Sequence, residues 1–274
     1  MMTSVVIPAH NEEAVLGRCL STLLADADED EFDVVVVPNA CTDNTAAVAR
    51  QYGVRVVETP YGGKAHALRL GDDTCRDFPR VYLDADIELS TQSVRELVAA
   101  LDRPGILACA PVPKWDLTGA GQIAKRVHRV HDRLIAPSRV LSGVGVYVLS
   151  KDGHAKAFPL PDIISDDGWV HRSFTPLERT VVPSAESVVR PARTVRAHLR
   201  RRVRLRQGNQ QLAAMGRPAP EGQLRLSALG SLITRRAVSP VDAACYLTVL
   251  VLDRILTRAK GNAAVRWSAD ASTR

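Results

Sequence analysis

The sequence predicts an α/β fold: a mostly parallel sheet with helices on both faces, followed by a helical extension at the C-terminal end. Three observations carry this prediction. Short runs of valine and isoleucine alternate with amphipathic stretches over residues 1–113 of the 274-residue chain. Such runs are typical of strands that helices bury on both faces. After residue 113 the alternation loosens, and the last long apolar stretch has the spacing of a helix.

The expected strands of the first half are short apolar runs. They lie at residues 4–7, 33–37, 54–57, 81–83 and 106–110. The helices between them have an apolar face or a capping side chain at their start, as Ser90 provides for the last one. They are expected at residues 11–24, 42–52, 64–74 and 90–101.

The second half has fewer clear elements. An amphipathic basic helix is expected over residues 123–135, a strand over 146–149, and helical structure from residue 185 onward. Pro218–Gly222 is rich in proline and glycine and has the composition of a linker. A last helix, expected over residues 240–257, has an apolar middle and a basic end.

Composition excludes several classes of protein. Five cysteines, an odd number without a C-x-x-C pair, argue against a disulfide framework or a zinc site and fit a reducing cytoplasm. The N-terminus lacks the basic region of a signal peptide. No apolar run approaches the roughly 18 to 20 residues that span a bilayer. We therefore expect a cytoplasmic protein.

The net charge of +6 is unevenly distributed. Between Arg190 and Arg206 the chain has eight arginines and no acidic residue, whereas the part before residue 103 is mixed or acidic. Such asymmetry indicates an anionic partner. For the apolar stretch Ala243–Leu252, a shallow contact with the inner face of a membrane and a homodimer contact are both open, as is packing on the protein's own core.

A pair of carboxylates follows the fourth expected strand. Asp84-Ala85-Asp86 comes directly after the apolar run 81–83. Side chains alternate in an extended chain, so the two carboxylates project to the same side. Such a pair of hard oxygen ligands suits Mg²⁺ or Mn²⁺ that holds a diphosphate. An acidic turn at a strand end is the simpler interpretation of the tripeptide alone, but the neighbouring turns favour the metal site.

Three other polar turns follow expected strands: Pro8–Glu12, Pro38–Ala40 and Gly62–Lys64. The carboxyl ends of parallel strands meet at one edge of a sheet, where open α/β sheets bind their ligands. We therefore expect all four turns at one site. The chain has neither a G-x-G-x-x-G fingerprint nor a Walker A loop, so this site would bind a nucleotide without either device.

Four segments, in this order and spacing, resemble family-2 glycosyltransferases of the GT-A fold. They are V-V-I-P-A-H-N-E-E (5–13), V-V-V-V-P-N-A-C-T-D-N-T (34–45), G-G-K-A-H-A-L (62–68) and L-D-A-D (83–86). The resemblance covers roughly residues 3–210. It implies a nucleotide-sugar donor bound at the turns described above.

The resemblance also implies roles for single residues in the nucleoside site. Pro8, Ala9 and Glu12 would cradle the nucleoside. Asn39 stands where the family usually has an aspartate that pairs with the base. Its amide offers both a donor and an acceptor that can pair with uracil, so a UDP-sugar is favoured. Lys64 would lie against the base or the phosphates as a point charge.

The metal site is implied in the same way. Asp84 would hold the ribose or the metal, and Asp86 would hold the metal itself, Mn²⁺ or Mg²⁺. In the transfer, that ion would neutralise the charge that develops on the leaving diphosphate. For Asn39 and Lys64, solvation in exposed loops is the alternative interpretation.

Ile164-Ser165-Asp166-Asp167 resembles the Glu-Asp segment of the family, whose second acid takes the proton of the acceptor hydroxyl. The resemblance implies that Asp167 is this base, with Asp166 as the second candidate. The same residues would also make a good helix N-terminus, so a capping role is the competing explanation.

Arg201, Arg202 and Arg204 could clamp the diphosphate with their guanidinium groups. Alternatively, these arginines lie on a solvated helix face or contact the surface of an anionic membrane. The segment lacks the Gln and Trp of the Q-x-x-R-W motif of processive members, and the chain lacks their membrane-spanning helices. We therefore expect transfer of a single sugar rather than polymerisation.

The sequence thus predicts a metal-dependent glycosyltransferase that moves one sugar from a nucleoside-diphosphate sugar to a hydroxyl acceptor with inversion. The expected domains are residues 1–216, with a nucleotide-sugar half (1–113) and an acceptor half (114–216), and a helical extension (217–274). A nucleotidyltransferase is disfavoured because the first turn lacks a glycine-rich loop. The alternative function is a basic module that binds anionic lipid or RNA through Arg190–Arg206, although that stretch has no aromatic residue for stacking on bases.

Overall fold

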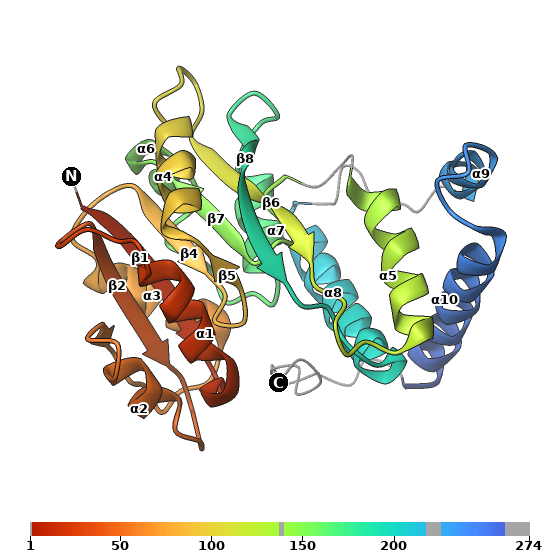
Figure 1. Cartoon of the computed structure of the whole chain (residues 1–274), viewed down its shortest axis with the longest axis horizontal. Coiled ribbons are helices and arrows are strands. Elements are labelled where there is room, and N and C mark those ends of the chain that lie inside the picture. The colour runs from red at the N-terminus through yellow and green to blue at the C-terminus, as the bar shows by residue number, and fades with distance from the viewer. Residues whose placement is uncertain (1, 137–139, 218–225, 261–274) are drawn as a thin grey trace.

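A single eight-stranded sheet forms the centre of the protein (Figure 1). The computed structural model describes residues 2–136, 140–217 and 226–260. The strands, in the spatial order β3-β2-β1-β4-β7-β6-β8-β5, are β1 (Thr3–Ala9), β2 (Phe32–Pro38), β3 (Arg55–Val56), β4 (Arg80–Leu83), β5 (Glu88–Leu89), β6 (Ala108–Trp115), β7 (Val146–Leu149) and β8 (Arg179–Val189).

The first four strands in this order are parallel, as the sequence predicts. β7 is inserted between β4 and β6 and runs antiparallel to both. β8 returns parallel to β6, and the short β5 pairs antiparallel with β8 at the edge. Because β6 and β8 therefore run in the same direction as β4, their carboxyl ends lie at the same edge of the sheet as those of the first half.

Ten helices occur in the described residues. They are α1 (Glu13–Leu24), α2 (Thr45–Arg50), α3 (Lys64–Thr74), α4 (Thr91–Ala100), α5 (Gln122–Ile135), α6 (Lys151–Ala157), α7 (Asp166–Arg172), α8 (Val195–Ala214), α9 (Leu226–Thr234) and α10 (Pro240–Lys260). Ser90 caps α4 as expected, since its hydroxyl accepts a hydrogen bond from the Ser93 amide (3.1 Å). The predicted α/β class, with helices on both faces and a helical end, is confirmed.

Alternate residues of β1 build the cores on the two faces of the sheet. Val5 and Ile7 pack with the apolar side chains of α1 and α4, and Val6 packs with those of α3, α6 and α7. α3 lies very close to the sheet, because a Cβ on Gly71 would stand 2.5 Å from a methyl group of Val6. Both layers hold the carboxyl ends of the strands in fixed positions.

The helices α5, α8, α9 and α10 form a separate bundle beside the sheet, on the side of β6 and β8 (Figure 1). Its core is aliphatic with one tyrosine, and contains Val127 and Val130 of α5, Leu229 of α9, and Tyr246 and Val249 of α10. The predicted C-terminal extension thus packs against helices that precede it in the chain.

The structure differs from the sequence prediction in the region after residue 185. The expected helix is instead the end of β8, which continues to Val189, and α8 begins only at Val195. Ala185, Ser187 and Val189 are buried while their neighbours face outward or are half-buried, which is the two-residue period of a strand. The elements β5 and α6 were not predicted, whereas α7 begins where the sequence offered a helix N-terminus as the alternative for Asp166 and Asp167, and α9 lies in the expected helical extension. The expected linker 218–222 lies outside the described residues.

No helix among the described residues has both the length and the apolar character needed to cross a membrane. The apolar middle that the sequence shows in the last helix belongs to α10, whose packing is described below.

Candidate active site

Three charged side chains from three elements meet at the carboxyl edge of the sheet. Lys64 is the first residue of α3, Asp84 directly follows β4, and Asp166 is the first residue of α7. The Lys64 Nζ atom lies 2.6 Å from Asp84 Oδ1 and 3.0 Å from Asp166 Oδ1. Burial lowers the pKa of Lys64, but the carboxylates of Asp166 and Asp84 outweigh it and raise that pKa above its ordinary value. Lys64 therefore stays protonated and links the two halves of the sheet.

The Asp84-Ala85-Asp86 turn places a second carboxylate beside the first. The Ile87 amide donates to the Asp84 carbonyl oxygen (3.1 Å) and closes the turn. Asp86 is half-buried. Burial and the Asp84 carboxylate raise the pKa of Asp86, while the charges of Arg201 and Lys64 lower it. Because the two carboxylates repel each other, a cation between them would be stabilised.

These donors fit Mn²⁺ or Mg²⁺ bound together with a diphosphate. In the described part of the chain, no three His, Cys, Asp or Glu side chains are arranged to hold a metal ion by themselves. Mg²⁺ is usually held by one or two carboxylates plus substrate phosphates rather than by a complete protein cage. Asp84 and Asp86 provide such a pair, with side-chain oxygens and no soft ligand.

Gly145, which precedes β7, fixes the position of this turn. Its carbonyl oxygen accepts a hydrogen bond from the Asp84 amide (2.9 Å), and its φ of 71° lies in the region that favours glycine. A Cβ at this position would stand 2.6 Å from a side-chain carbon of Ile87. A larger residue at 145 would therefore displace the acidic turn.

Asp166 and Asp167 are adjacent in the chain but lie in different environments. Asp166 is buried, and besides Lys64 its carboxylate accepts a hydrogen bond from the Tyr147 hydroxyl (3.4 Å). Burial, together with the charges of Asp167 and Asp84, raises the pKa of Asp166 to about 6, although Lys64 opposes this shift. Asp166 is therefore held toward the centre of the site.

Asp167 is half-buried and faces the loop before β7. Its carboxylate accepts hydrogen bonds from the Gly143 amide (2.7 Å), the Gly168 amide (2.7 Å) and the Ser165 hydroxyl (2.9 Å). Burial raises the pKa of Asp167, but Lys64 and these donors outweigh it and hold that pKa below its usual range. Asp167 is thus ionised near neutral pH and ties the start of α7 to the Gly143 loop.

The expected nucleoside cradle lies at the ends of β1 and β2. Pro8 and Ala9 are buried at the end of β1, and Glu12 is half-buried, with its amide bonded to the Thr45 hydroxyl (2.7 Å). The first turn is therefore anchored to the start of α2. The two turns that the resemblance joins in one nucleoside site are brought together by the structure.

Asn39 has a different environment from the one that base pairing needs. Its side chain is fully buried, and its amide nitrogen donates to the Ala9 carbonyl oxygen (2.8 Å). Its amide oxygen accepts a hydrogen bond from the Gly63 amide (3.1 Å). Asn39 therefore braces the first and third turns against each other. In this arrangement its amide is not presented to a uracil, contrary to the expectation from the sequence.

The arginines of α8 face two different parts of the molecule. Arg201 is exposed, and its charge acts on Asp86 and lowers the pKa of that carboxyl. Arg202 Nε instead lies 2.8 Å from Asp253 Oδ2 in α10, and Arg206 pairs with the same carboxylate. Arg204 is half-buried on the same helix. Of the three arginines expected at the diphosphate, Arg201 thus acts on the acidic turn, whereas Arg202 faces the helical bundle.

Sequence reasoning missed two residues that support the site. Tyr147 lies opposite Tyr82 in the β4–β7 pair, and the two rings stack with centroids 4.9 Å apart. The similar strands V-Y-L and V-Y-V-L were the available signal. Arg190 pairs with Glu88 and lies 2.9 Å from Asp116, so it joins β5 to the end of β6. No local pattern distinguishes this arginine from its neighbours.

The match with a family model agrees with this geometry. Residues 4–134 match the model of glycosyl transferase family 2. These residues are a family-2 glycosyltransferase domain. This confirms the family that the four motifs predicted, over the part of the chain that contains the nucleoside turns, Lys64 and the acidic turn.

Curated relatives match less than half of the chain. The 4,4'-diaponeurosporenoate glycosyltransferase of Staphylococcus aureus is 30% identical over an alignment of 122 residues, and the match covers 42% of this chain and 32% of the relative. The chain therefore spans about a third of the length of the curated relatives it matches.

Solved structures share the fold over more of the chain. A mannosyltransferase from Pyrobaculum calidifontis in complex with GDP-Man and Mn²⁺ has a TM-score of 0.60 at 18% identity and covers 95% of this chain and 76% of its own. Staphylococcus aureus TarS with UDP-GlcNAc has a TM-score of 0.54 at 18% identity, covering 70% and 59%. Glucosyl-3-phosphoglycerate synthase from Mycobacterium tuberculosis with Mn²⁺, UDP and glucosyl-3-phosphoglycerate has a TM-score of 0.54 at 22% identity, covering 80% and 81%. These likenesses confirm the GT-A fold.

Proposed function

We propose that the protein is a metal-dependent glycosyltransferase that moves a single sugar from a nucleoside-diphosphate sugar to a hydroxyl acceptor with inversion. One observation carries this proposal: Lys64 bridges Asp84 and Asp166 at the sheet edge, directly beside the second carboxylate of the acidic turn. The solved complexes with GDP-Man, UDP-GlcNAc and Mn²⁺ support the donor class and the metal.

Asp84 and Asp86 would hold the metal, which would supply charge neutralisation on the leaving diphosphate. The residues of the chain then have separate tasks. Lys64 and the exposed Arg201 both add positive charge near the acidic turn, since both lower the pKa of Asp86. Asp166, buried and bonded to Lys64, keeps the lysine in place. Such preorganised charge favours a transition state in which negative charge develops.

We propose Asp167 as the base that takes the acceptor proton. It is half-buried, near the Gly143 loop, and ionised near neutral pH. Asp166 is the second candidate, because its pKa of about 6 suits proton transfer. Its burial and its ion pair with Lys64 keep it from an acceptor, however, so we assign it a positioning role.

We propose UDP as the first nucleotide to test, together with GDP, because the fold neighbours were solved with both kinds of donor. The buried amide of Asn39 does not provide a base contact in this structure. Base selectivity would then come from backbone groups of the turns that follow β1 and β2. Pro8, Ala9 and Glu12 lie in the first of these turns.

The alternative, a basic module that binds through Arg190–Arg206, is less well supported. Three of its eight arginines already pair with acids of the protein itself. Arg190 pairs with Glu88, and both Arg202 and Arg206 pair with Asp253.

The test is a thermal-shift panel of UDP, GDP, CDP and dTDP, each with Mn²⁺, Mg²⁺ or a chelator. A ligand at a hundred times its Kd adds about 2.7 kcal/mol of stability, which raises the melting temperature visibly. We expect one diphosphate to stabilise the protein only when the metal is present. Stabilisation that persists with the chelator would contradict the metal role, and no shift with any nucleotide would contradict the donor proposal.

A further inference from the structure

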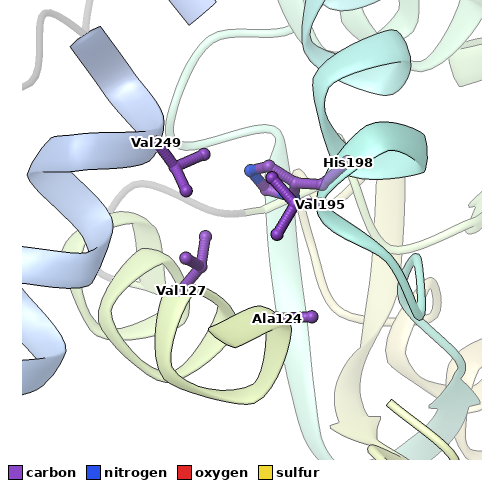
Figure 2. Close-up of a pocket in the computed structure, with 5 residues that line it drawn as sticks. All are labelled: Ala124, Val127, Val195, His198 and Val249. Atoms are coloured by element: carbon purple, nitrogen blue, oxygen red, sulfur yellow. The ribbon is translucent and has the colours of Figure 1, made fainter. Parts of the chain in front are cut away.

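The two faces of α10 differ sharply in composition. The inward face carries Tyr246 and Val249, which belong to the bundle core. Figure 2 shows Val249 directed from α10 toward Val127 of α5 and Val195 of α8, next to His198. Within the part of the chain that the structure describes, the core contacts of α10 are on this side, so the outward face is not needed for this packing.

The outward face of α10 is apolar. Five of its solvent-facing side chains are large and hydrophobic, with exposed fractions between 37% and 58%: Val241, Leu247, Val251, Leu252 and Ile255. The described part of the chain has eleven exposed large hydrophobic side chains in all, so this one helix holds almost half of them. Surface helices normally carry polar residues on this side. We call these five residues the α10 stripe.

The exposed charged side chains within residues 226–255 are all arginines. Residues 226–255 contain two acids, Asp242 and Asp253, and both are buried, at 2% and 1% exposure. Asp242 pairs with Arg126 and Arg129 (2.7 Å each), and Asp253 pairs with Arg202 and Arg206. Neither acid therefore contributes negative charge to the outer surface.

Exposed arginines stand at both ends of the stripe. Arg235 and Arg236 precede α10, and Arg254 lies within it, next to Ile255. An exposed apolar helix face with arginines beside it and no exposed acid has the character of a helix that lies in the interface of a lipid bilayer. A second copy of the chain is a poorer occupant, because paired stripes would bring the same arginines together without a compensating acid.

We propose that the outward face of α10 docks on the surface of an anionic lipid bilayer. The helix would lie parallel to the membrane, with the α10 stripe between the acyl chains and headgroups and with Arg235, Arg236 and Arg254 at the lipid phosphates. The proposal depends on the α10 stripe and not on the glycosyl transfer proposed above.

The test is co-sedimentation of the full chain with vesicles of phosphatidylcholine alone or of phosphatidylcholine mixed with phosphatidylglycerol. We expect binding to the anionic vesicles. The double substitution Val251→Ser/Ile255→Ser should lower the partition coefficient about tenfold or more, because it removes buried apolar area. Arg235→Gln/Arg236→Gln should weaken binding about fivefold per arginine, and on anionic vesicles only.

Leu177→Ser is the matched control, since this side chain is 86% exposed on a distant turn before β8 and should leave vesicle binding unchanged. All variants should keep the melting temperature and the nucleotide-dependent thermal shift of the parent, which separates a docking defect from a donor-site defect.

Equal vesicle binding by the parent and the α10 double variant would overturn the proposal. So would a parent protein that does not bind vesicles, or one that light scattering finds as a dimer that the same double substitution dissociates.

Discussion

The protein buries acidic side chains next to cations both at the sheet edge and in the helical bundle, and these two places are built differently. At the sheet edge, Lys64 is shared between two aspartates, and the pKa values of Asp86 and Asp166 are raised. In the helical bundle, each buried acid of α10 has two arginines. Burial raises the pKa of Asp242, but its arginine partners outweigh it and hold that pKa below its usual range.

The difference concerns which charge is in excess. The sheet edge has more carboxylates than cations in contact with them, so it gains free energy when a further cation enters. The bundle has more guanidinium groups than carboxylates, and each of its two buried acids is paired with two arginines. The first arrangement suits a binding site, and the second suits a fixed connection between helices. The predictions below separate these two roles.

The largest effect is expected for Asp86→Asn. Loss of this carboxylate should lower the rate of transfer by about a thousandfold, because the charge on the leaving diphosphate is no longer neutralised. The melting temperature without ligand should stay the same or rise, since a repulsive pair is removed. Transfer assays with Mn²⁺ and a thermal melt check both. A large fall in melting temperature would instead show that Asp86 stabilises the fold.

Asp167→Asn should lower the rate of transfer by roughly a hundredfold to ten-thousandfold, the usual range for a lost general base. Nucleotide binding should change little. Asp166→Asn should weaken nucleotide binding as well, because the position of Lys64 depends on it. Isothermal titration and initial rates distinguish the two. If Asp166→Asn alone removes turnover without loss of binding, the base is Asp166.

Asp253→Ala should destabilise the bundle by about 3 kcal/mol, since it leaves Arg202 and Arg206 without their carboxylate. Urea unfolding measures the loss, with the exposed Asp102→Ala as control. The thermal shift by nucleotide and metal should be retained. A loss of nucleotide binding that exceeds the loss of stability would show that the two charged regions are not separate.

A histidine cluster in the bundle makes stability depend on pH. Burial lowers the pKa of His198 to about 3, and the charges of His128, Arg202 and Arg201 add to this. Burial also lowers the pKa values of His131 and His128. The side chain of Tyr246 packs beside His131. The folded protein thus holds these imidazoles neutral.

The imidazole of His198 binds a proton near pH 6.5 in the unfolded chain but not in the folded protein. Its contribution to the free energy of unfolding is therefore complete above pH 6.5 and is lost as the pH falls from 6.5 toward 3. At pH 5, protonation of His198 in the unfolded chain should alone lower the free energy of unfolding by about 2 kcal/mol. Denaturant unfolding from pH 7.5 to 5 measures the slope. His198→Phe should flatten it, and an unchanged slope in this variant would exclude His198 as its source.

The smallest effects are expected for substitutions of two neighbouring arginines in α8. Arg201→Gln should weaken nucleotide affinity about tenfold, because this charge acts on the acidic turn. Arg202→Gln should leave nucleotide affinity unchanged and lower stability, because Arg202 pairs with Asp253. Titrations and melts of the two variants, one residue apart, compare both regions directly. The reverse outcome would exchange the two assignments.

The strands and turns of the first half could be predicted because their information is local. Val34–Val37 is a continuous apolar run, and polar turns follow it and its neighbours. The meeting of Lys64 with Asp84 follows from parallel topology alone. The burial of single polar side chains could not be predicted in the same way. Asn39 looks like an exposed turn residue in the sequence, yet it is fully buried because Ala9 and Gly63 both need its amide.

The second half could be predicted less well because its partners are far apart in the chain. Asp242 and Asp253 resemble ordinary solvated acids on a helix, and nothing near them indicates arginines 51 and 116 positions away. The end of β8 was mistaken for a helix because its arginine-rich surroundings hide a short two-residue period at Ala185, Ser187 and Val189.

The double pairing of the α10 acids has a consequence for anyone who shortens this protein. A truncated chain that ends before α9 would keep Arg126, Arg129, Arg202 and Arg206 but lose both carboxylates that neutralise them. Four guanidinium groups would then be exposed on one side, beside newly uncovered valines. Such a fragment would carry over nucleic acid during purification and would stick to anionic resins. The sheet-containing part is therefore best produced with the helical bundle complete.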